Sequence, residues 1–411
     1  MCSESKLGWA LPALRPAQLH WQRRPTKQGC GQVFRQTPSK APSSSGLQLH
    51  HTTAPTLSRS RRIGRNSQAH QRIMASDAGL PRATFAKLSP HPYLLANLEP
   101  SNDDVPPARS NGRAPQEVRT PTINLSSLSH AHGSAVVRMG DTTVICGVRG
   151  ETILTSNIPN HRASNTETEL KDYDLLVPNI ELATGSAPQF LPGGPPTTLA
   201  QTLSTRIYSL LHSSKLIDAD DLRIWHTKPS EQMVADEDAM DQDGAEEGDA
   251  GNADKYVVAY WVLYIDIFFI SFDGNPFDAA WAATVAALRD TKIPQARFDS
   301  DRELVICSKK DPKALTINGM PIACTAAVFT GKETDRPTDG KYWLLVDPDL
   351  LEETLCDESV TMVVDCSGGA TKILSISKHG GVILSPKHLR SKQLFDWAAR
   401  RWKDVAAAIG Q

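Results

Sequence analysis

Residues 265–288 read IDIFFISFDGNPFDAAWAATVAAL, and this stretch decides the fold class. An apolar run ends at Asp273-Gly274-Asn275, and a segment rich in small residues follows at once. Asn275 is a residue type that caps the free backbone N–H groups of a helix, and Pro276 suits the first helical position. The pattern therefore predicts a strand, a tight turn and a helix that begins at the turn.

The large apolar side chains of the expected helix recur every three or four residues, which places them on one face: Phe277, Trp281, Val285 and Leu288. A tight turn at the N-terminus of a helix is also a place where backbone N–H groups bind phosphate. The residues of the turn at 273–277 therefore bear on whether the protein is an enzyme or a structural relative of one.

The composition indicates a globular chain without metal chemistry. Its 411 residues leave room for two or three domains, at the usual ~100–200 residues per domain. A hydrophobic fraction of 40% and eight tryptophans are enough for a packed core. The seven cysteines are scattered, with no C-x-x-C pair and no Cys/His cluster at zinc-ligand spacing. We expect reduced thiols, as in the cytosol or nucleus, and neither a metal site nor a cofactor.

The formal net charge of −2 averages two opposed segments. Residues 1–73 carry twelve Lys or Arg against one acid, Glu4, a net charge of about +11, and we expect them to be disordered. Three hypotheses are open for them: an organelle transit peptide, a basic arm for nucleic acid, or a segment absent from the mature protein, because Met74-Ala75-Ser76-Asp77 resembles a natural start.

The second charged segment, residues 231–254, has ten acids and no base. We interpret it as a solvated loop inserted between two strands, with an acidic docking segment or a mimic of nucleic-acid charge as the sharper hypothesis. The rest of the chain is close to neutral, so it lacks the overall basic character typical of a nucleic-acid-binding domain.

Residues 256–272, YVVAYWVLYIDIFFISF, are apolar enough to suggest a membrane span, but the run is shorter than the ~20 residues required and contains Asp266. Its density of Val, Ile, Tyr and Phe instead favours one long strand, or two joined by a bulge, in a sheet buried on both faces.

The remaining segments alternate between strand and helix patterns. Residues 134–148 hold two apolar runs split by Met139-Gly140-Asp141, which predicts a hairpin. Residues 198–216 and 388–409 have helical periodicity. Further strands are predicted at 303–306, 322–329, 342–346, 360–364 and 373–377. Strands in runs with a few long helices indicate the α+β class.

Residues 109–151 read RSNGRAPQEVRTPTINLSSLSHAHGSAVVRMGDTTVICGVRGE and resemble the opening of the RNase PH fold. This family starts with an R-x-D-G-R-like motif, a further arginine and then G-S-A-x-V-x-x-G-x-T-x-V-x-x-G-V. The resemblance covers roughly residues 90–408. It extends to the D-G-N turn with its following D-A-A, to Val346-Asp347-Pro348 with Glu352-Glu353, and to Lys378-His379-Gly380-Gly381.

The resemblance implies an α+β RNase PH fold, of the ribosomal protein S5 domain 2-like type, with a smaller C-terminal RNase PH subdomain. The implied organisation has an N-terminal lead-in helix within residues 74–108. A first domain follows at 109–294 and carries the acidic insert 229–254. The second domain and the C-terminal helix occupy 295–411.

Within the family the chain is similar to the non-catalytic ring subunits of the eukaryotic RNA exosome, on the strength of the D-G-N turn, Leu176-Val177-Pro178-Asn179 and the V-D-P segment. Such subunits build a ring of six RNase PH-type domains that carries RNA-binding cap proteins and passes RNA through a channel to bound nucleases. The resemblance implies a structural role in 3′–5′ RNA processing and degradation, rRNA maturation included. It also implies ring and cap subunits as partners, no membrane, and a location in nucleus, nucleolus and cytoplasm.

Active members of the family resemble one another in a D-G-G-T-R-type turn, in which a hydroxyl, an arginine and a helix N-terminus hold phosphate. Here the turn reads Asp273-Gly274-Asn275-Pro276-Phe277. Pro276 stands at the hydroxyl position and removes a backbone N–H donor. Phe277 stands at the arginine position, and a phenyl ring does not neutralise phosphate.

Active members also have a pair of acids near the start of a late strand, which position metal or transfer protons. Asp357 matches the first acid and Ser359 falls at the second. We therefore expect a pseudoenzyme without phosphorolytic activity of its own. Four arginines are candidates for facing RNA: Arg113, Arg119, Arg138 and Arg149.

Two other functions stay open. The first is a phosphorolytic 3′–5′ exoribonuclease whose active site is shared with a neighbouring subunit that supplies the missing groups. The second is a stand-alone RNA-binding protein that uses the basic arm at residues 1–73.

Overall fold

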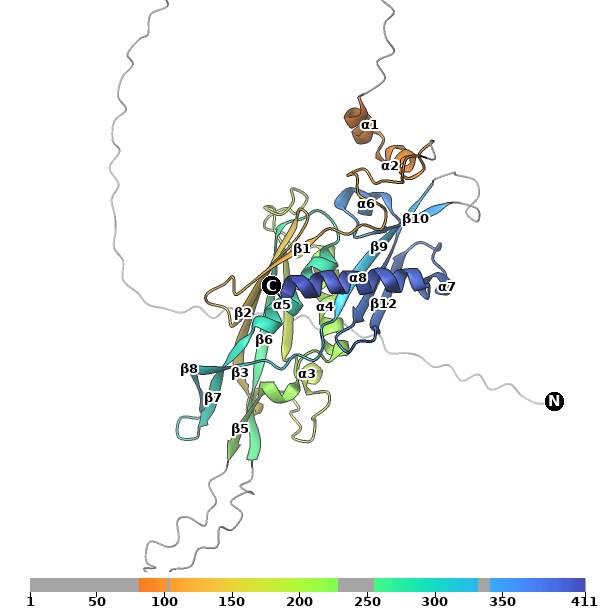
Figure 1. The fold of residues 1–411 in the computed structure, drawn as a ribbon. Coiled ribbons are helices and arrows are strands. Elements are labelled where there is room, and N and C mark those ends of the chain that lie inside the picture. Colours follow the sequence, from red (N-terminus) through yellow and green to blue (C-terminus); the bar gives the residue numbers. More distant parts are fainter. Residues whose placement is uncertain (1–80, 102–103, 228–254, 332–340, 411) are drawn as a thin grey trace, which may run out of the picture. The chain divides into compact units, whose positions relative to one another are not determined.

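The computed structural model describes residues 81–101, 104–227, 255–331 and 341–410 (Figure 1). All of them belong to the unit Ala75–Gln411. The basic extension 1–73 and the acidic insert 229–254 lie outside the described residues, so the hypotheses about them stay predictions. Within the described ranges, no helix is long and apolar enough to cross a membrane.

The first sheet has six strands in the order β1-β2-β3-β6-β4, with β5 paired to the N-terminal part of β6. Strand β4 runs parallel to β6, and the other pairings are antiparallel. The predicted hairpin is confirmed as β2 and β3, which turn at Gly140 and Asp141. The strands are β1 Pro121–Leu125, β2 Gly133–Met139, β3 Thr142–Leu154, β4 Leu176–Leu182, β5 Arg223–Thr227 and β6 Lys255–Ser271.

The second sheet has four antiparallel strands in the order β10-β9-β11-β12. They are β9 Ile322–Thr330, β10 Tyr342–Val346, β11 Glu358–Asp365 and β12 Lys372–Gly380, and each includes a strand predicted from the sequence. A two-stranded ribbon, β7 Lys292–Asp299 and β8 Leu304–Ala314, forms a third sheet, and its β7 contacts β5 of the first. The predicted boundary between residues 294 and 295 falls inside β7 and stays a prediction.

Two long helices were predicted near their observed bounds. Helix α4 (Thr198–Ser214) buries the expected apolar stripe, including Leu203 and Ile207, and the Thr197 hydroxyl caps it by accepting the N–H of Ala200. Helix α5 (Pro276–Asp290) begins at the predicted turn. The shorter helical elements are η1 Thr155–Asn157, α3 Glu169–Asp172, η2 Ala219–Leu222 and α6 Leu350–Leu355.

Two of the predicted helices are each divided into two helices in the structure. The predicted lead-in helix is α1 (Arg82–Leu88) and α2 (Pro90–Leu98), because the residue before a proline disfavours the helical backbone. The predicted closing helix 388–409 is α7 (Pro386–Leu389) and α8 (Lys392–Ile409). Ser391 interrupts it as the N-cap of α8.

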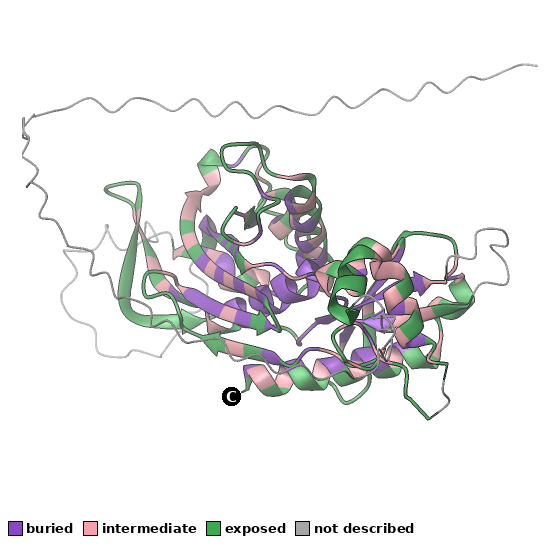
Figure 2. Cartoon of the chain, turned by 90° about the horizontal axis from the view of Figure 1, so that it is seen from above, coloured by how far each residue is buried: buried purple, intermediate pink, exposed green. Residues whose placement is uncertain are grey.

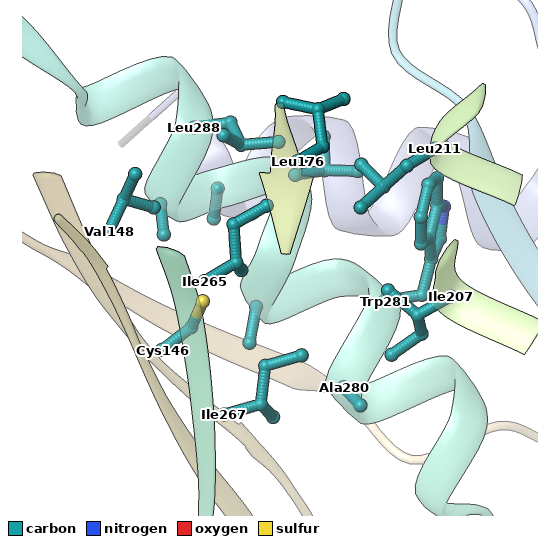
Figure 3. Close-up of a cluster of buried hydrophobic side chains, with 14 of the residues drawn as sticks. Cys146, Val148, Leu176, Ile207, Leu211, Ile265, Ile267, Ala280, Trp281 and Leu288 are labelled. Atoms are coloured by element: carbon teal, nitrogen blue, oxygen red, sulfur yellow. The ribbon is translucent and has the colours of Figure 1, made fainter. Parts of the chain in front are cut away.

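Helix α5 lies between the two sheets, in contact with β1, β2, β3 and β6 on one side and with β9 on the other (Figure 1). Every residue from Pro276 to Leu288 is buried (Figure 2), so burial includes the predicted apolar face and extends around the rest of the helix. The many alanines of α5 make this close approach possible on all sides. Figure 3 shows Trp281 and Ala280 packed among side chains of β3, β4, β6 and α4.

Strand β6 confirms the prediction of a strand at 256–272. The expected burial on both faces is wrong for its second half, because α5 covers one face and no element among the described residues covers the other. There the exposed side chains alternate with buried ones, at Tyr264, Asp266, Phe268 and Ile270. This exposed stretch is called the outer face of β6 below.

Candidate functional site

The turn after β6 borders a pocket of about 280 Å³ between α4, α5, α6 and the second sheet. The pocket brings Asn275, Pro276 and Phe277 of the turn together with Asp357 and Ser359. These are the two sequence elements that the family resemblance assigned to one active site, 80 residues apart in the chain.

The backbone of the turn is held tightly. Gly274 has a φ of 72°, and a Cβ at this position would lie 2.4 Å from the Asp349 carbonyl carbon, so only glycine fits. The Thr142 hydroxyl donates to the Gly274 carbonyl and accepts the N–H of Asp273, both at 3.0 Å. The N-terminus of α5 is therefore fixed by the start of β3 and the start of α6.

Asn275 is the N-cap residue by position, but the expected side-chain cap is absent. A capping residue needs an extended backbone, whereas Asn275 is left-handed with a φ of 48°. Its amide nitrogen instead donates to Asp278 at 2.9 Å and to Asp347 at 2.7 Å. Its backbone N–H donates to the Glu353 carboxylate at 2.7 Å.

Pro276 and Phe277 are both buried at the start of α5. The guanidinium of Arg206, from α4, lies over the Phe277 ring with its carbon 3.9 Å from the ring centroid, a cation–π contact. Sequence reasoning missed Arg206, whose only signal was a single cation beside the apolar stripe of α4. Phe277 stands where active relatives have an arginine, and the structure places the guanidinium of Arg206 against its ring.

Arg206 is held by hydroxyl groups. It donates to Thr361 at 3.1 Å and to Ser377 at 3.4 Å. Burial lowers the pKa of Arg206 below its ordinary value, and the charge of Asp278 offsets part of that effect. Among the described residues it has no carboxylate within ion-pair distance, so its charge is not neutralised locally.

The predicted acid site retains one exposed carboxylate, that of Asp357, while Ser359 is half-buried on β11. Glu358 lies between them and is buried in a structural role. It accepts the N–H groups of Ile383 and Leu384 at 2.8 and 2.9 Å and pairs with Lys378 at 3.0 Å. Asp357 and Ser359 thus line the pocket without forming a pair of acids.

Glu353 of α6 also lines the pocket and was missed from the sequence. Burial raises the pKa of Glu353 to about 7, although the N–H of Asn275 and the charge of Arg119 lower it in part. This carboxyl therefore titrates near neutral pH beside the start of α5.

We expect Glu353 to make the fold less stable as the pH rises. Its ordinary pKa is 4.5, so between pH 4.5 and 7 the folded chain binds the proton more tightly than the unfolded chain. This stabilisation is complete below pH 4.5 and is lost as the pH rises through 7. Between pH 5 and 8, the free energy of unfolding of wild type, measured in urea, should fall by about 1–3 kcal/mol relative to that of Glu353→Gln. Parallel pH profiles for the two proteins would contradict this.

Of the four predicted RNA-facing arginines, Arg119 is buried and Arg113 is half-buried, which corrects the prediction for these two. Arg119 has a side chain only 8% exposed and donates twice to the Asp347 carboxylate, at 2.8 and 3.0 Å. Arg113 lies 3.8 Å from Asp347 and 3.7 Å from Glu352. Neither is free to bind RNA, because internal carboxylates occupy both.

Arg138 and Arg149 stay candidates for RNA contact. Their side chains are 64% and 69% exposed, and each pairs with a neighbouring acid, Asp141 and Glu151 respectively. Such exposed pairs are weak, so both guanidinium groups remain accessible to a phosphate.

A buried ion-pair cluster, Arg109, Arg113, Arg119, Asp347 and Glu352, joins the chain before β1 to the end of β10 and to α6. Arg109 pairs with Glu352 at 3.1 Å, with both side chains fully buried. Burial alone would raise the pKa of Asp347, but the hydrogen bonds and charges of Arg119, Arg401 and Asn275 outweigh it and hold the pKa well below its usual range.

Within the described ranges, no group of three or more His, Cys, Asp or Glu residues is arranged to hold a metal ion. Five cysteines are free thiols there: Cys146, Cys307, Cys324, Cys356 and Cys366.

Two regions of the chain match the two domains of one family. Residues 117–294 match RNase PH, the 3′ exoribonuclease family, domain 1, and residues 319–391 match domain 2 of that family. The chain is 32% identical over 307 residues to "Exosome complex component rrp43" of Schizosaccharomyces pombe, covering 74% of this chain and 90% of that protein. It is 30% identical over 301 residues to "Exosome complex component Rrp42" of Methanopyrus kandleri, covering 73% and 90%.

Solved structures share the fold. The chain matches an Archaeoglobus fulgidus exosome with RNA bound to the active site at a TM-score of 0.52 and 22% identity, covering 77% of this chain and 96% of that one. It also matches an archaeal exosome core at a TM-score of 0.52 and 21% identity. That match covers 81% of this chain and 100% of the other. The predicted α+β RNase PH fold is confirmed.

Proposed function

The chain belongs to the RNase PH family of 3′ exoribonucleases, and from this premise we propose that it is a ring subunit of an RNA exosome that does not itself cleave RNA. The relatives named as exosome components support the assembly. The observation that carries the proposed loss of catalysis is the turn at the start of α5, where Pro276 and Phe277 stand in place of a hydroxyl and a guanidinium.

Phosphorolysis places a phosphate dianion beside the phosphodiester of RNA, so a competent site must offset several negative charges. Pro276 offers no N–H, and the guanidinium of Arg206 is stacked on Phe277. Asp357 is not accompanied by a second acid at Ser359, and Glu353 adds a carboxyl group to the pocket. The pocket therefore lacks both the donors that would hold phosphate at the turn and the second acid that would position a metal or transfer a proton.

The outer face of β6 supports assembly into a ring. Phe268 is 38% exposed and Ile270 46%, while the residues between and beside them on β6, Ile267 and Phe269, are buried. Exposed apolar side chains in one patch are typical of a surface that a partner covers. We propose that another RNase PH-type subunit covers it, and that cap subunits and RNA in the channel complete the complex in nucleus, nucleolus and cytoplasm.

Phe268→Glu is expected to prevent assembly without unfolding the chain. A charge in an apolar interface leaves a desolvated carboxylate, while the substitution at an exposed position should change the free energy of unfolding by less than about 0.5 kcal/mol. Co-purification with ring subunits and thermal unfolding measure the two effects. Leu191→Glu, at a loop residue 81% exposed, is the matched control and should still assemble; equal assembly of both variants would contradict the interface.

Affinity purification of the tagged chain, with identification of the co-purifying proteins, tests the assembly. The expected result is a set of other RNase PH-type subunits together with cap subunits. Recovery of the chain without any such subunit would rule out the proposed role.

A second candidate function is a phosphorolytic site completed by a neighbouring subunit, and Arg206 is the observation that favours it. This half-buried cation lines the pocket without a carboxylate partner among the described residues. The neighbour would still have to supply the hydroxyl and the second acid. The third hypothesis, an RNA-binding protein that uses residues 1–73, concerns a segment outside the described residues and stays a prediction.

A further inference from the structure

A second pocket, of about 380 Å³, lies between strands β5 and β6 and the β7–β8 ribbon. Its volume is in the range of sites for a single small molecule or one side group of a larger ligand. It shares no residue with the pocket at the start of α5. None of its residues has a part in the proposed assembly or in the degenerate active site.

Two tryptophans give this pocket an aromatic character. Trp225 of β5 is 49% exposed, and Trp261 of β6 is 5% exposed. The apolar side chains of Ile293, Pro294 and Leu315 line the same pocket. A half-exposed indole within a concavity offers a flat apolar surface on which a ring can stack.

The polar groups of the pocket are held by ion pairs and still face solvent. Asp220 pairs with Arg223, and its side chain is 69% exposed. Lys313 lies 2.6 Å from Asp221 and is itself 68% exposed. Arg223 is anchored by the buried Glu169 at the other side. Two acids and two bases leave the pocket nearly neutral, with an exposed acceptor and an exposed cation.

We propose that this pocket binds one unpaired nucleotide of single-stranded RNA. The base stacks on Trp225, an N–H group on its edge donates to the Asp220 carboxylate, and Lys313 attracts the phosphate. Unpaired RNA bases are recognised in this way by aromatic stacking and by hydrogen bonds to their edges. The proposal rests on the proposed role in RNA handling, which makes RNA the ligand with an aromatic ring, donor groups and a phosphate.

Trp225→Ala in the full chain tests the pocket. Binding of a fluorescein-labelled, eight-nucleotide single-stranded RNA is measured by anisotropy, and a 4-thiouridine version of the RNA is cross-linked to locate the contact. Stacking of one base corresponds to roughly a 5- to 150-fold change in affinity. We therefore expect Trp225→Ala to bind that much more weakly, with wild-type cross-links mapping to the β5 and β7 segments that line the pocket.

Two variants make the test specific. Trp225→Phe keeps a ring and should retain affinity within about fivefold of wild type. Tyr342→Ala removes an aromatic side chain 37% exposed on the second sheet and should bind as wild type does. Equal affinity of Trp225→Ala and wild type, cross-links confined to other segments, or no measurable binding by wild type would each overturn the proposal.

The outcome is independent of the proposed assembly. Trp225→Ala is expected to co-purify with ring subunits as wild type does, because the pocket lies away from the outer face of β6. Failure of wild type to co-purify would count against the ring role alone. Normal co-purification together with unchanged RNA affinity in Trp225→Ala would count against the pocket alone.

Discussion

Asp347→Ala is expected to lower the free energy of unfolding by about 3–5 kcal/mol, the usual result of removing one partner of a buried ion pair. The side chain of Asp347 is 2% exposed and accepts hydrogen bonds from Arg119 and Asn275. Without it, the buried guanidinium of Arg119 loses its carboxylate. The Asn275 amide also loses one of its two acceptors, so the turn at the start of α5 loosens as well.

Urea unfolding followed by circular dichroism measures this loss. The matched control is Asp141→Ala, which removes an acid 86% exposed and 3.8 Å from Arg138. That pair is on the surface and should change the free energy of unfolding by less than about 0.5 kcal/mol. Similar losses for the two variants would show that the ion-pair cluster does not join the two sheets as described.

Trp281→Ala, as a single substitution, is expected to lower the free energy of unfolding by ~3–5 kcal/mol, because it opens a cavity beside the middle of α5. Trp281 is fully buried, and its indole N–H donates to the Pro321 carbonyl at 2.8 Å. The helix contacts both sheets, so the cavity weakens the packing between them and leaves that carbonyl without its donor.

The half-exposed Trp225 provides the comparison. Trp225→Ala also removes an indole, but from a surface pocket, and should lower the free energy of unfolding by less than about 1 kcal/mol. Chemical unfolding of both variants distinguishes them. A small loss for Trp281→Ala would mean that α5 is not the packing centre between the two sheets.

The elements that the sequence predicts well are those with a strong local pattern. Strand β6 is dense in β-branched and aromatic residues, α4 has a regular apolar stripe, and the hairpin of β2 and β3 turns at Gly140. The family motifs add the overall fold, because they join these elements in an order that local patterns do not specify.

The predictions that failed depend on contacts between distant segments. Arg113 and Arg119 were candidates for facing RNA, but they pair with Asp347 and Glu352, which follow more than 200 residues later in the chain. The periodicity of α5 indicates the face with Phe277, Trp281, Val285 and Leu288, but it does not reveal the second sheet that contacts the helix on the other side.

Only part of the candidate site was predicted, because the site also depends on contacts between distant segments. Residues 273–277, Asp357 and Ser359 carry family motifs, and the structure brings the turn and these two residues into one pocket. Arg206 carries no motif in this sequence, and Glu353 belongs to a family segment for which no place in the pocket was predicted. Their presence in the pocket follows from the packing of α4 and α6, which is a property of the folded chain.

The most direct test of the account is phosphorolysis. The purified chain is incubated with single-stranded RNA, inorganic phosphate and Mg²⁺, and the nucleoside diphosphates released are measured. With Pro276 and Phe277 in the turn and Ser359 in place of a second acid, we expect no release above the protein-free control. Phosphate-dependent release of nucleoside diphosphates by this chain would contradict the account.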